Sequence, residues 1–139
     1  MAPYGDGDAS FCAAGQRDGL AKLVDAFYDY MCELPEAAII RAMHDDDLTS
    51  AREKLTVFLC GWLGGPKTYA TRFGRIRIPA AHAHLAIDEP ERDAWLLCMQ
   101  HAVADQHDWA DDFKAYFLHE ISVPAERVRR ASVARRADA

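Results

Sequence analysis

Hydrophobic residues recur at intervals of three and four along much of the chain, which is the pattern of helices that bury one face. The first long stripe lies between Asp18, a candidate N-cap, and Pro35, which follows its end. A short helix is predicted over residues 35–43, and a long one over about 48–63, where a Gly-Gly-Pro sequence ends it. The first stripe consists of Leu20, Leu23, Val24, Phe27, Tyr28 and Met31.

The second half of the chain predicts further helices. Asp88 and Glu91 form an Asp-x-x-Glu capping box, which opens a helix that runs to about Val103. A last helix is expected over about 108–122, with Pro124 as its limit. Because no segment alternates long enough to form a strand, the sequence predicts an all-α protein with five or six helices.

Length and composition favour a single domain. The chain has 139 residues, half of them hydrophobic, which suits one core. We expect a disordered N-terminal segment over 1–10, a helical domain over 11–123 and a basic, flexible tail over 124–139. The tail is interpreted as a solvated end; contact with an acidic partner or a membrane surface is the alternative. Its basic residues are Arg127, Arg129, Arg130, Arg135 and Arg136.

Charge and local composition narrow the class of protein. The net charge of −6 argues against a general nucleic-acid binder. No apolar run is long enough to span a membrane, and the N-terminus lacks the basic and apolar parts of a signal peptide, so a cytoplasmic location is expected. The four cysteines include no Cys-x-x-Cys pair, and Cys60 and Cys98 are predicted to pack in the core.

Three polar or amphipathic residues interrupt the apolar pattern. Tyr28 and Trp95 lie on apolar stripes, so each needs a hydrogen-bond partner if it is buried. His44 stands between an apolar residue and three aspartates, at the junction of two predicted helices. Ordinary packing or capping explains each of them singly.

Two histidines, His82 and His84, are separated by a single residue. They lie in a short helix that Pro79 is expected to open. The stretch before it, residues 66–78, is expected to be irregular with one helical turn. On a helix, residues two apart point about 200° away from one another, so His82 and His84 cannot face the same centre. One histidine makes a poor zinc site. It is sufficient for haem iron, because the porphyrin supplies the other four nitrogens. An all-α chain with one suitable histidine therefore raises the hypothesis of a haem protein.

Several motifs, in this order, resemble the bacterial truncated haemoglobins of group II over roughly residues 14–121. The most specific are the Trp-x-Gly-Gly-Pro-like loop and an Arg-Asp-x-Trp-x-x-Cys-Met run. The matching residues are Phe27-Tyr28, Met43-His44, Asp47-Leu48, Lys54-Leu55, Phe58-Leu59, Gly61 to Pro66, Tyr69, Gly74, His82 and Glu91 to Met99.

The resemblance implies a truncated globin domain over 11–123, a two-over-two helical sandwich around haem b. It implies that His82 is the proximal iron ligand and that Tyr28, His44 and Trp95 lie on the distal side, where dioxygen, carbon monoxide and nitric oxide would bind. The implied haem-contact residues are Phe27, Ala51, Leu55, Phe58, Trp62, Tyr69, Arg75, Arg77 and Met99.

One departure from the family pattern concerns the edge of the haem. Ala81 stands where relatives often carry an arginine that reaches a haem propionate, so Arg75, Arg77 or Lys67 is expected to replace it. Ala51 stands where many globins keep a distal histidine, so that gate residue is absent.

The resemblance thus predicts a haem-binding globin that binds dioxygen and other diatomic ligands. Its chemistry is left open: nitric oxide dioxygenase or peroxidase-like activity is implied for some members, and neither is proved by the sequence. The alternative is a haem-based gas or redox sensor that acts through a protein partner, with the basic tail as contact surface. A third hypothesis, loss of haem, is suggested by Ala81, whereas the joint presence of His82, Tyr28 and Trp95 argues against it. The reductase partner, and whether the protein is a monomer or a homodimer, are not determined.

Overall fold

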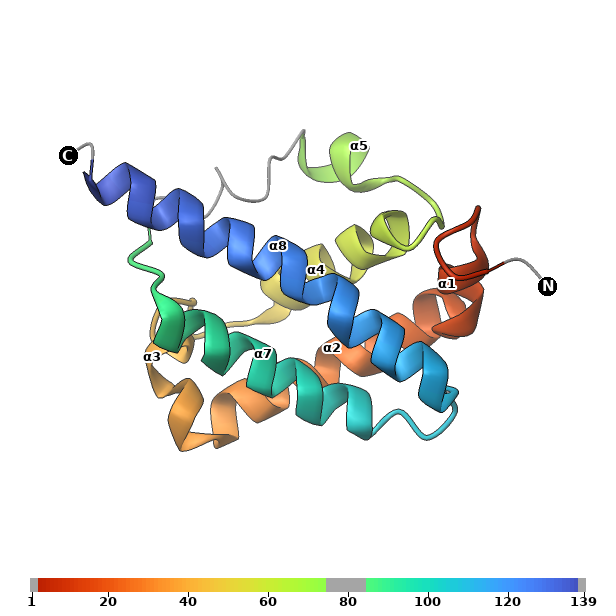
Figure 1. Cartoon of the computed structure of the whole chain (residues 1–139), viewed down its shortest axis with the longest axis horizontal. Helices are drawn as coiled ribbons and strands as arrows, with labels where there is room; N and C mark the ends of the chain where they lie inside the picture. Colours follow the sequence, from red (N-terminus) through yellow and green to blue (C-terminus); the bar gives the residue numbers. More distant parts are fainter. Residues whose placement is uncertain (1–2, 75–84, 138–139) are drawn as a thin grey trace.

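The computed structural model describes residues 3–74 and 85–137, and all regular elements within these ranges are helical. Figure 1 shows a long C-terminal helix that runs the length of the molecule. The elements are α1 (Ala9–Ala13), α2 (Gln16–Glu33), the 3-10 turn η1 (Pro35–Ala37), α3 (Ala38–Arg41), α4 (Thr49–Trp62), α5 (Tyr69–Phe73), α7 (Glu89–Ala104) and α8 (Asp111–Ala137).

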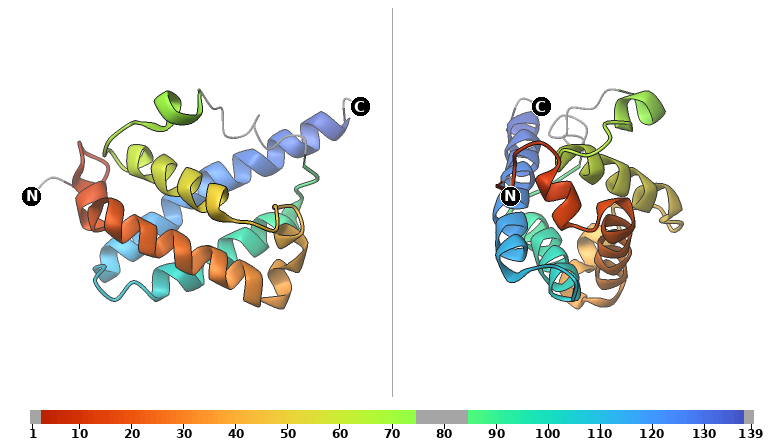
Figure 2. Two further views of the ribbon diagram at one scale, coloured as in Figure 1. Left: turned by 180° about the vertical axis from the view of Figure 1, so that it is seen from behind. Right: turned by 90° about the vertical axis from the view of Figure 1, so that its right-hand side faces the viewer.

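The four long helices form two layers. Helix α2 packs against α4 in its own layer and against α7 in the other, and α7 packs against α8. The end-on view in Figure 2 shows α2 and α4 on one side of the molecule and α7 and α8 on the other. The predicted all-α class is therefore confirmed, and the arrangement is a two-over-two sandwich.

Helix α2 supplies the centre of the core. All six residues of its predicted stripe are buried, as the spacing required. The helix begins earlier than expected, because Gly15 takes the left-handed conformation (φ 84°) and reverses the chain between α1 and α2. Asp18 consequently lies in the first turn instead of at the N-cap, where its charge still suits the helix dipole.

Helix α7 begins as predicted. The Asp88 side chain accepts a hydrogen bond from the Glu91 backbone N–H, and the Asp88 backbone N–H donates to Glu91 Oε1 at 2.9 Å. This capping box satisfies two of the N–H groups that a helix start leaves without partners. The predicted start of α7, with Asp88 as its N-cap, is therefore confirmed.

The predicted end of the last helix at Pro124 is wrong, because α8 continues through this proline to Ala137. Proline inside a helix removes one hydrogen bond and costs about 3 kcal/mol or more. The turns beyond it form compensating contacts: Glu126 accepts hydrogen bonds from Arg92 of α7, at 2.9 Å, and from Arg129. The described part of the segment that we expected to be a flexible tail, residues 124–137, is thus helical.

The N-terminal residues also make defined contacts. The Tyr4 ring packs edge-to-face on Phe113, with ring centroids 5.1 Å apart, and its hydroxyl donates to Asp112 at 2.9 Å. Within the segment that we expected to be disordered, Tyr4 therefore rests on α8, and residues 9 and 10 form the start of α1.

The cysteines behave as predicted, since Cys60 and Cys98 are buried in the core cluster. Cys12 and Cys32 are exposed. In the two described ranges, every helix is too short or too polar to cross a lipid bilayer.

We predict that Gly19→Ala lowers the free energy of unfolding by about 1–3 kcal/mol, because α1 and α2 pack too closely to admit a methyl group. A Cβ at Gly19 would lie 1.8 Å from the Ala14 carbonyl oxygen. The matched control is Gly61→Ala in α4, where the nearest atoms would lie 3.4–3.5 Å away. There the higher helix propensity of alanine should leave stability unchanged or raise it by up to about 1 kcal/mol. Urea unfolding measures both, and equal stabilities of the two variants would contradict the prediction.

Candidate functional site

Three residues predicted for the distal side belong to one cluster, in which Tyr28 and Trp95 contact Phe27 and His44 contacts Tyr28. The Phe27 ring meets Tyr28 and Trp95 edge-to-face, with ring centroids 5.0 Å apart in both pairs. His44 lies edge-on to Tyr28, with centroids 5.8 Å apart. Residues from α2, from α7 and from the loop after α3 thus form one aromatic cluster. Its role in ligand binding remains a prediction.

Tyr28 is the most buried polar group of this cluster. Its side chain is 5% exposed, and burial raises its pKa to about 12, while the charge of Arg52 acts in the opposite direction. Because neutral pH lies far below this value, the phenol keeps its proton and can donate a hydrogen bond. Among the described residues, no group forms a hydrogen bond with the Tyr28 hydroxyl.

The hydrogen bond of His44 limits what this residue can do. Its Nδ1 lies 2.8 Å from the Ile40 carbonyl oxygen. Because a carbonyl oxygen only accepts, Nδ1 carries the proton, and in the neutral ring Nε2 is an acceptor. His44 can therefore donate to a ligand through Nε2 only when the ring is protonated.

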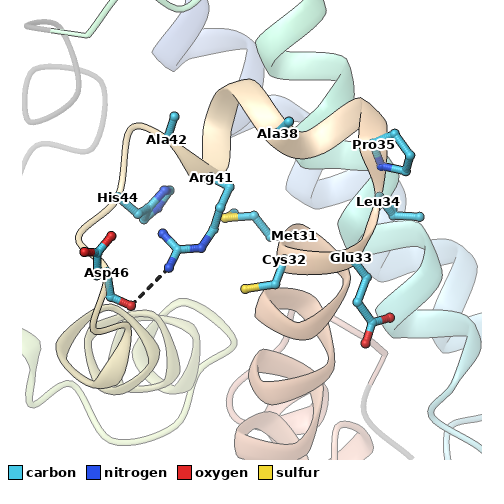
Figure 3. Close-up of a pocket in the computed structure, with 10 residues that line it drawn as sticks. All are labelled: Met31, Cys32, Glu33, Leu34, Pro35, Ala38, Arg41, Ala42, His44 and Asp46. Carbon is cyan, nitrogen blue, oxygen red and sulfur yellow. Dashed lines mark hydrogen bonds between the residues drawn. The ribbon is translucent and has the colours of Figure 1, made fainter.

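A surface pocket of about 530 Å³ adjoins His44 at the C-terminal end of α2 (Figure 3). Arg41 fixes the loop that carries His44, since its guanidinium donates to the Asp45 and Asp46 carbonyl oxygens at 3.0 Å each. His44 thus contacts both the pocket and Tyr28. The lining residues are Met31, Cys32, Glu33, Leu34, Pro35, Ala38, Arg41, Ala42, His44 and Asp46.

Arg52 of α4 is a residue of this region that sequence reasoning missed. Its guanidinium donates to the backbone oxygen and carboxylate of Asp25, and to the carboxylate of Asp29, all at 3.1 Å. The guanidinium carbon lies 5.6 Å from the centroid of the Tyr28 ring, within the range of a cation–π contact. The signal in the sequence is the pair of aspartates three residues before and one residue after Tyr28, which a basic residue on a neighbouring helix can bridge.

The predicted apolar contact residues divide into two groups. Ala51, Leu55, Phe58 and Trp62 follow helical spacing on α4, and all four are half-buried side chains packed against the core. Tyr69 of α5 is also half-buried and meets Phe58 edge-to-face. These side chains leave apolar surface of the kind that a flat porphyrin would cover. By contrast, Phe27 and Met99 are fully buried members of the core cluster.

The predicted iron ligand, His82, lies outside the described residues, and so do His84, Ala81, Arg75 and Arg77. Their roles stay predictions. In the described part of the chain, no group of three or more histidine, cysteine, aspartate or glutamate side chains is placed to hold a metal ion.

The fold and the aromatic cluster together define a two-over-two truncated globin. A family model for bacterial-like globins matches residues 10–125, so the chain belongs to the bacterial-like globin family. The chain is 34% identical over 84 residues to the group 2 truncated hemoglobin YjbI of Bacillus subtilis (strain 168), a match that covers 60% of this chain and 61% of that relative.

Solved structures agree with this classification. The group II 2-on-2 hemoglobin from the plant pathogen Agrobacterium tumefaciens superposes with a TM-score of 0.81 at 30% identity, covering 86% of this chain and 92% of that one. A truncated oxygen-avid haemoglobin from Bacillus subtilis superposes with a TM-score of 0.77 at 28% identity, covering 86% and 98%. The resemblance to group II truncated haemoglobins is therefore confirmed, and membership of this family implies haem binding.

We predict that Arg52→Gln alters the environment of Tyr28 more than it alters stability. Ion pairs with exposed carboxylates contribute about 0.2–1 kcal/mol each, so the loss in unfolding free energy should be small. Tyr28 should, however, lose its contact with the Arg52 guanidinium. The changed surroundings of the phenol should shift or broaden the C–O stretching band of the carbon monoxide complex in infrared spectra.

The matched control is Arg17→Gln, which also removes a bond between α2 and α4, from Arg17 to Glu53 at 2.6 Å. Arg17 lies eleven residues before Tyr28 on α2, about 16 Å along the helix axis, so this variant should keep the wild-type band. An unchanged band in Arg52→Gln would show that Arg52 has no influence on the distal side.

Proposed function

We propose that this protein binds haem b through His82 and holds dioxygen and other diatomic ligands beside Tyr28 and Trp95. The observation that carries the proposal is the aromatic cluster of Phe27, Tyr28, Trp95 and His44, in a chain of the bacterial-like globin family. Haem iron, when bound, supplies the site at which dioxygen, carbon monoxide and nitric oxide bind.

The residues of the described ranges fit such a group. The half-buried side chains of α4 offer apolar surface, and the aromatic cluster offers hydrogen-bond donors to a small polar ligand. A single histidine is enough for the iron, and His82 is the residue that the family pattern assigns. Because Ala81 offers no propionate contact, the haem is held mainly by His82 and by apolar contact, with Arg75 or Arg77 as candidates for the propionate.

The distal donors favour retention of a ligand. The raised pKa of Tyr28 keeps its phenol protonated at neutral pH, and the Trp95 indole N–H is a donor at every pH. A hydrogen bond to a charged or strongly polarised acceptor contributes about 1.5–3 kcal/mol net. Two such donors slow ligand release by orders of magnitude, because about 1.4 kcal/mol corresponds to a factor of ten. The similar truncated haemoglobin from Bacillus subtilis is oxygen-avid, which supports the same proposal.

Slow release suits oxygen, nitric oxide or peroxide chemistry better than oxygen transport, which needs timely dissociation. Turnover as a nitric oxide dioxygenase or a peroxidase would need electrons from a reductant outside the described site. The sensor alternative depended on a free basic tail. Three of the arginines of that tail instead form ion pairs with carboxylates of the same chain, Arg129 and Arg130 with Glu126 and Arg136 with Asp88. No observation therefore favours the sensor over the gas-binding globin.

We predict that His82→Ala abolishes or greatly weakens haem binding, whereas His84→Ala leaves the absorption spectrum nearly unchanged. The reason is that the family pattern assigns the iron ligand to His82, and the two side chains cannot share one centre on a helix. Absorption spectra of the purified variants after haem titration measure the effect. Equal loss of the Soret band in both variants would contradict the assignment of the ligand.

We predict that Tyr28→Phe and Trp95→Phe each change the dioxygen dissociation rate about tenfold or more, because each removes one donor near the ligand. The matched control is Tyr30→Phe on the same helix, whose hydroxyl donates to Asp105 at 2.5 Å at the surface. This control should release dioxygen at the wild-type rate. Stopped-flow replacement of dioxygen by carbon monoxide measures all three, and wild-type rates in both distal variants would exclude the proposed donors.

A further inference from the structure

The last three turns of α8 lie beyond the region that the family model matches. The match ends at residue 125, whereas α8 continues to Ala137. Figure 1 shows the end of this helix beside the segment that leads into α7. The extension is anchored at its start by Glu126, which accepts hydrogen bonds from Arg92 of α7 and from Arg129 and Arg130 of α8.

Ser132 connects this extension to the backbone before α7. Its side chain is completely buried, and its Oγ accepts a hydrogen bond from the Ile87 backbone N–H at 2.9 Å. The same hydroxyl donates to the Leu85 carbonyl oxygen. One hydroxyl thus satisfies two backbone groups of an irregular segment, which would otherwise need water or another partner.

Arg136 binds the same segment one turn further along the helix. Its Nη1 and Nη2 donate to the two carboxylate oxygens of Asp88, at 3.0 and 2.6 Å, and Nη2 lies 3.4 Å from the Ile87 carbonyl oxygen. Two parallel N–H bonds to one carboxylate fix its orientation as well as its distance. Arg136 also lowers the pKa of the Asp88 carboxyl, which is at the same time the N-cap of α7.

We define Ser132 and Arg136, together with residues 85–88, as the C-terminal clasp. Residues 85–88 follow His82 by three positions and lead into the helix that carries Trp95. The backbone on this side of His82 is therefore held by side chains of the extension as well as by the capping box.

We propose that Ser132 and Arg136 are positioning residues, which hold the chain after His82 and thereby fix the orientation of the iron ligand and slow the loss of haem. This inference rests on the proposed function, because it takes His82 as the ligand. Both residues lie beyond the region that the family model matches. The ring orientation of an iron-bound histidine is set by the groups that hold it, so a looser segment should be visible at the iron.

The test compares Ser132→Ala and Arg136→Gln with two matched controls in the full-length protein. Ser122→Ala removes a hydroxyl of α8 whose partner, among the described residues, is the His119 carbonyl of the same helix. Arg135→Gln removes the charge of the exposed residue next to Arg136. Arg136→Lys serves as the conservative variant, because it keeps the charge and loses the two-pronged bond.

Three measurements separate positioning from general stability. Amide hydrogen exchange reports the opening of residues 85–88 directly, in the protein as purified. Resonance Raman spectra of the ferrous protein report the iron–histidine stretching frequency. Transfer to excess apomyoglobin reports the rate of haem loss.

We expect exchange at residues 85–88 and haem loss to accelerate about 5- to 30-fold in Ser132→Ala and Arg136→Gln, with a shifted iron–histidine band. Arg136→Lys should restore part of the effect, and both controls should match the wild type. If Ser132→Ala does not fold, Arg136→Gln, a change at the surface, decides the outcome.

Unchanged exchange at residues 85–88 in Arg136→Gln would overturn the clasp. Faster exchange with an unchanged band and unchanged haem loss would overturn its link to the iron. A wild-type protein that takes up no haem would instead overturn the proposed function and with it the link to the iron, and the exchange data would still decide whether the clasp orders residues 85–88.

Discussion

The arrangement of this protein depends on the apolar face of α2, which is shared between two neighbours. A helix gains most of its stability in a protein by burying such a face, because isolated helices of this length are marginal in water. Helix α2 buries its stripe against α4 in one layer and α7 in the other, so it fixes the spacing between the layers. Phe27 and Tyr28 belong to this stripe. The geometry of the candidate site is therefore tied to the packing of the core.

Local hydrogen bonds then decide the chemistry of the side chains that the core brings together. Burial keeps Tyr28 protonated, whereas the bond between His44 Nδ1 and the Ile40 carbonyl makes the other nitrogen of a neutral His44 an acceptor. Two residues assigned to the same side of the haem thus differ in their hydrogen bonding, since the Tyr28 phenol can donate whereas Nε2 of a neutral His44 ring can only accept. Arg52 adds a third influence, since it binds both aspartates that flank Tyr28 and places its charge near the phenol ring.

Helix α8 shows how tertiary contacts overrule a local signal. Pro124 is a strong helix breaker in an isolated segment, yet the turns beyond it bury Ser132 and bind Arg92, Leu85, Ile87 and Asp88 through side chains. These partners lie 34–48 positions earlier in the chain, so no pattern within the helix reveals them. The family pattern also gives no sign of them, because the matched region ends at residue 125.

The sequence by itself determined the helical class, the buried stripe of α2, the capping box of α7 and the family, because each of these depends on the spacing of residues close together in the chain. It also identified Tyr28, His44 and Trp95 as residues to consider, through their resemblance to a family pattern. It placed the start of α2 and the end of α8 incorrectly, and it missed Arg52. Only the tertiary structure decided these points: the turn at Gly15, the bridge from Arg52 to α2 and the contacts of Ser132 and Arg136 each depend on which surfaces meet. Contacts between residues far apart in sequence carry no local periodicity, and the free energy that they contribute is enough to outweigh the preference of a single proline.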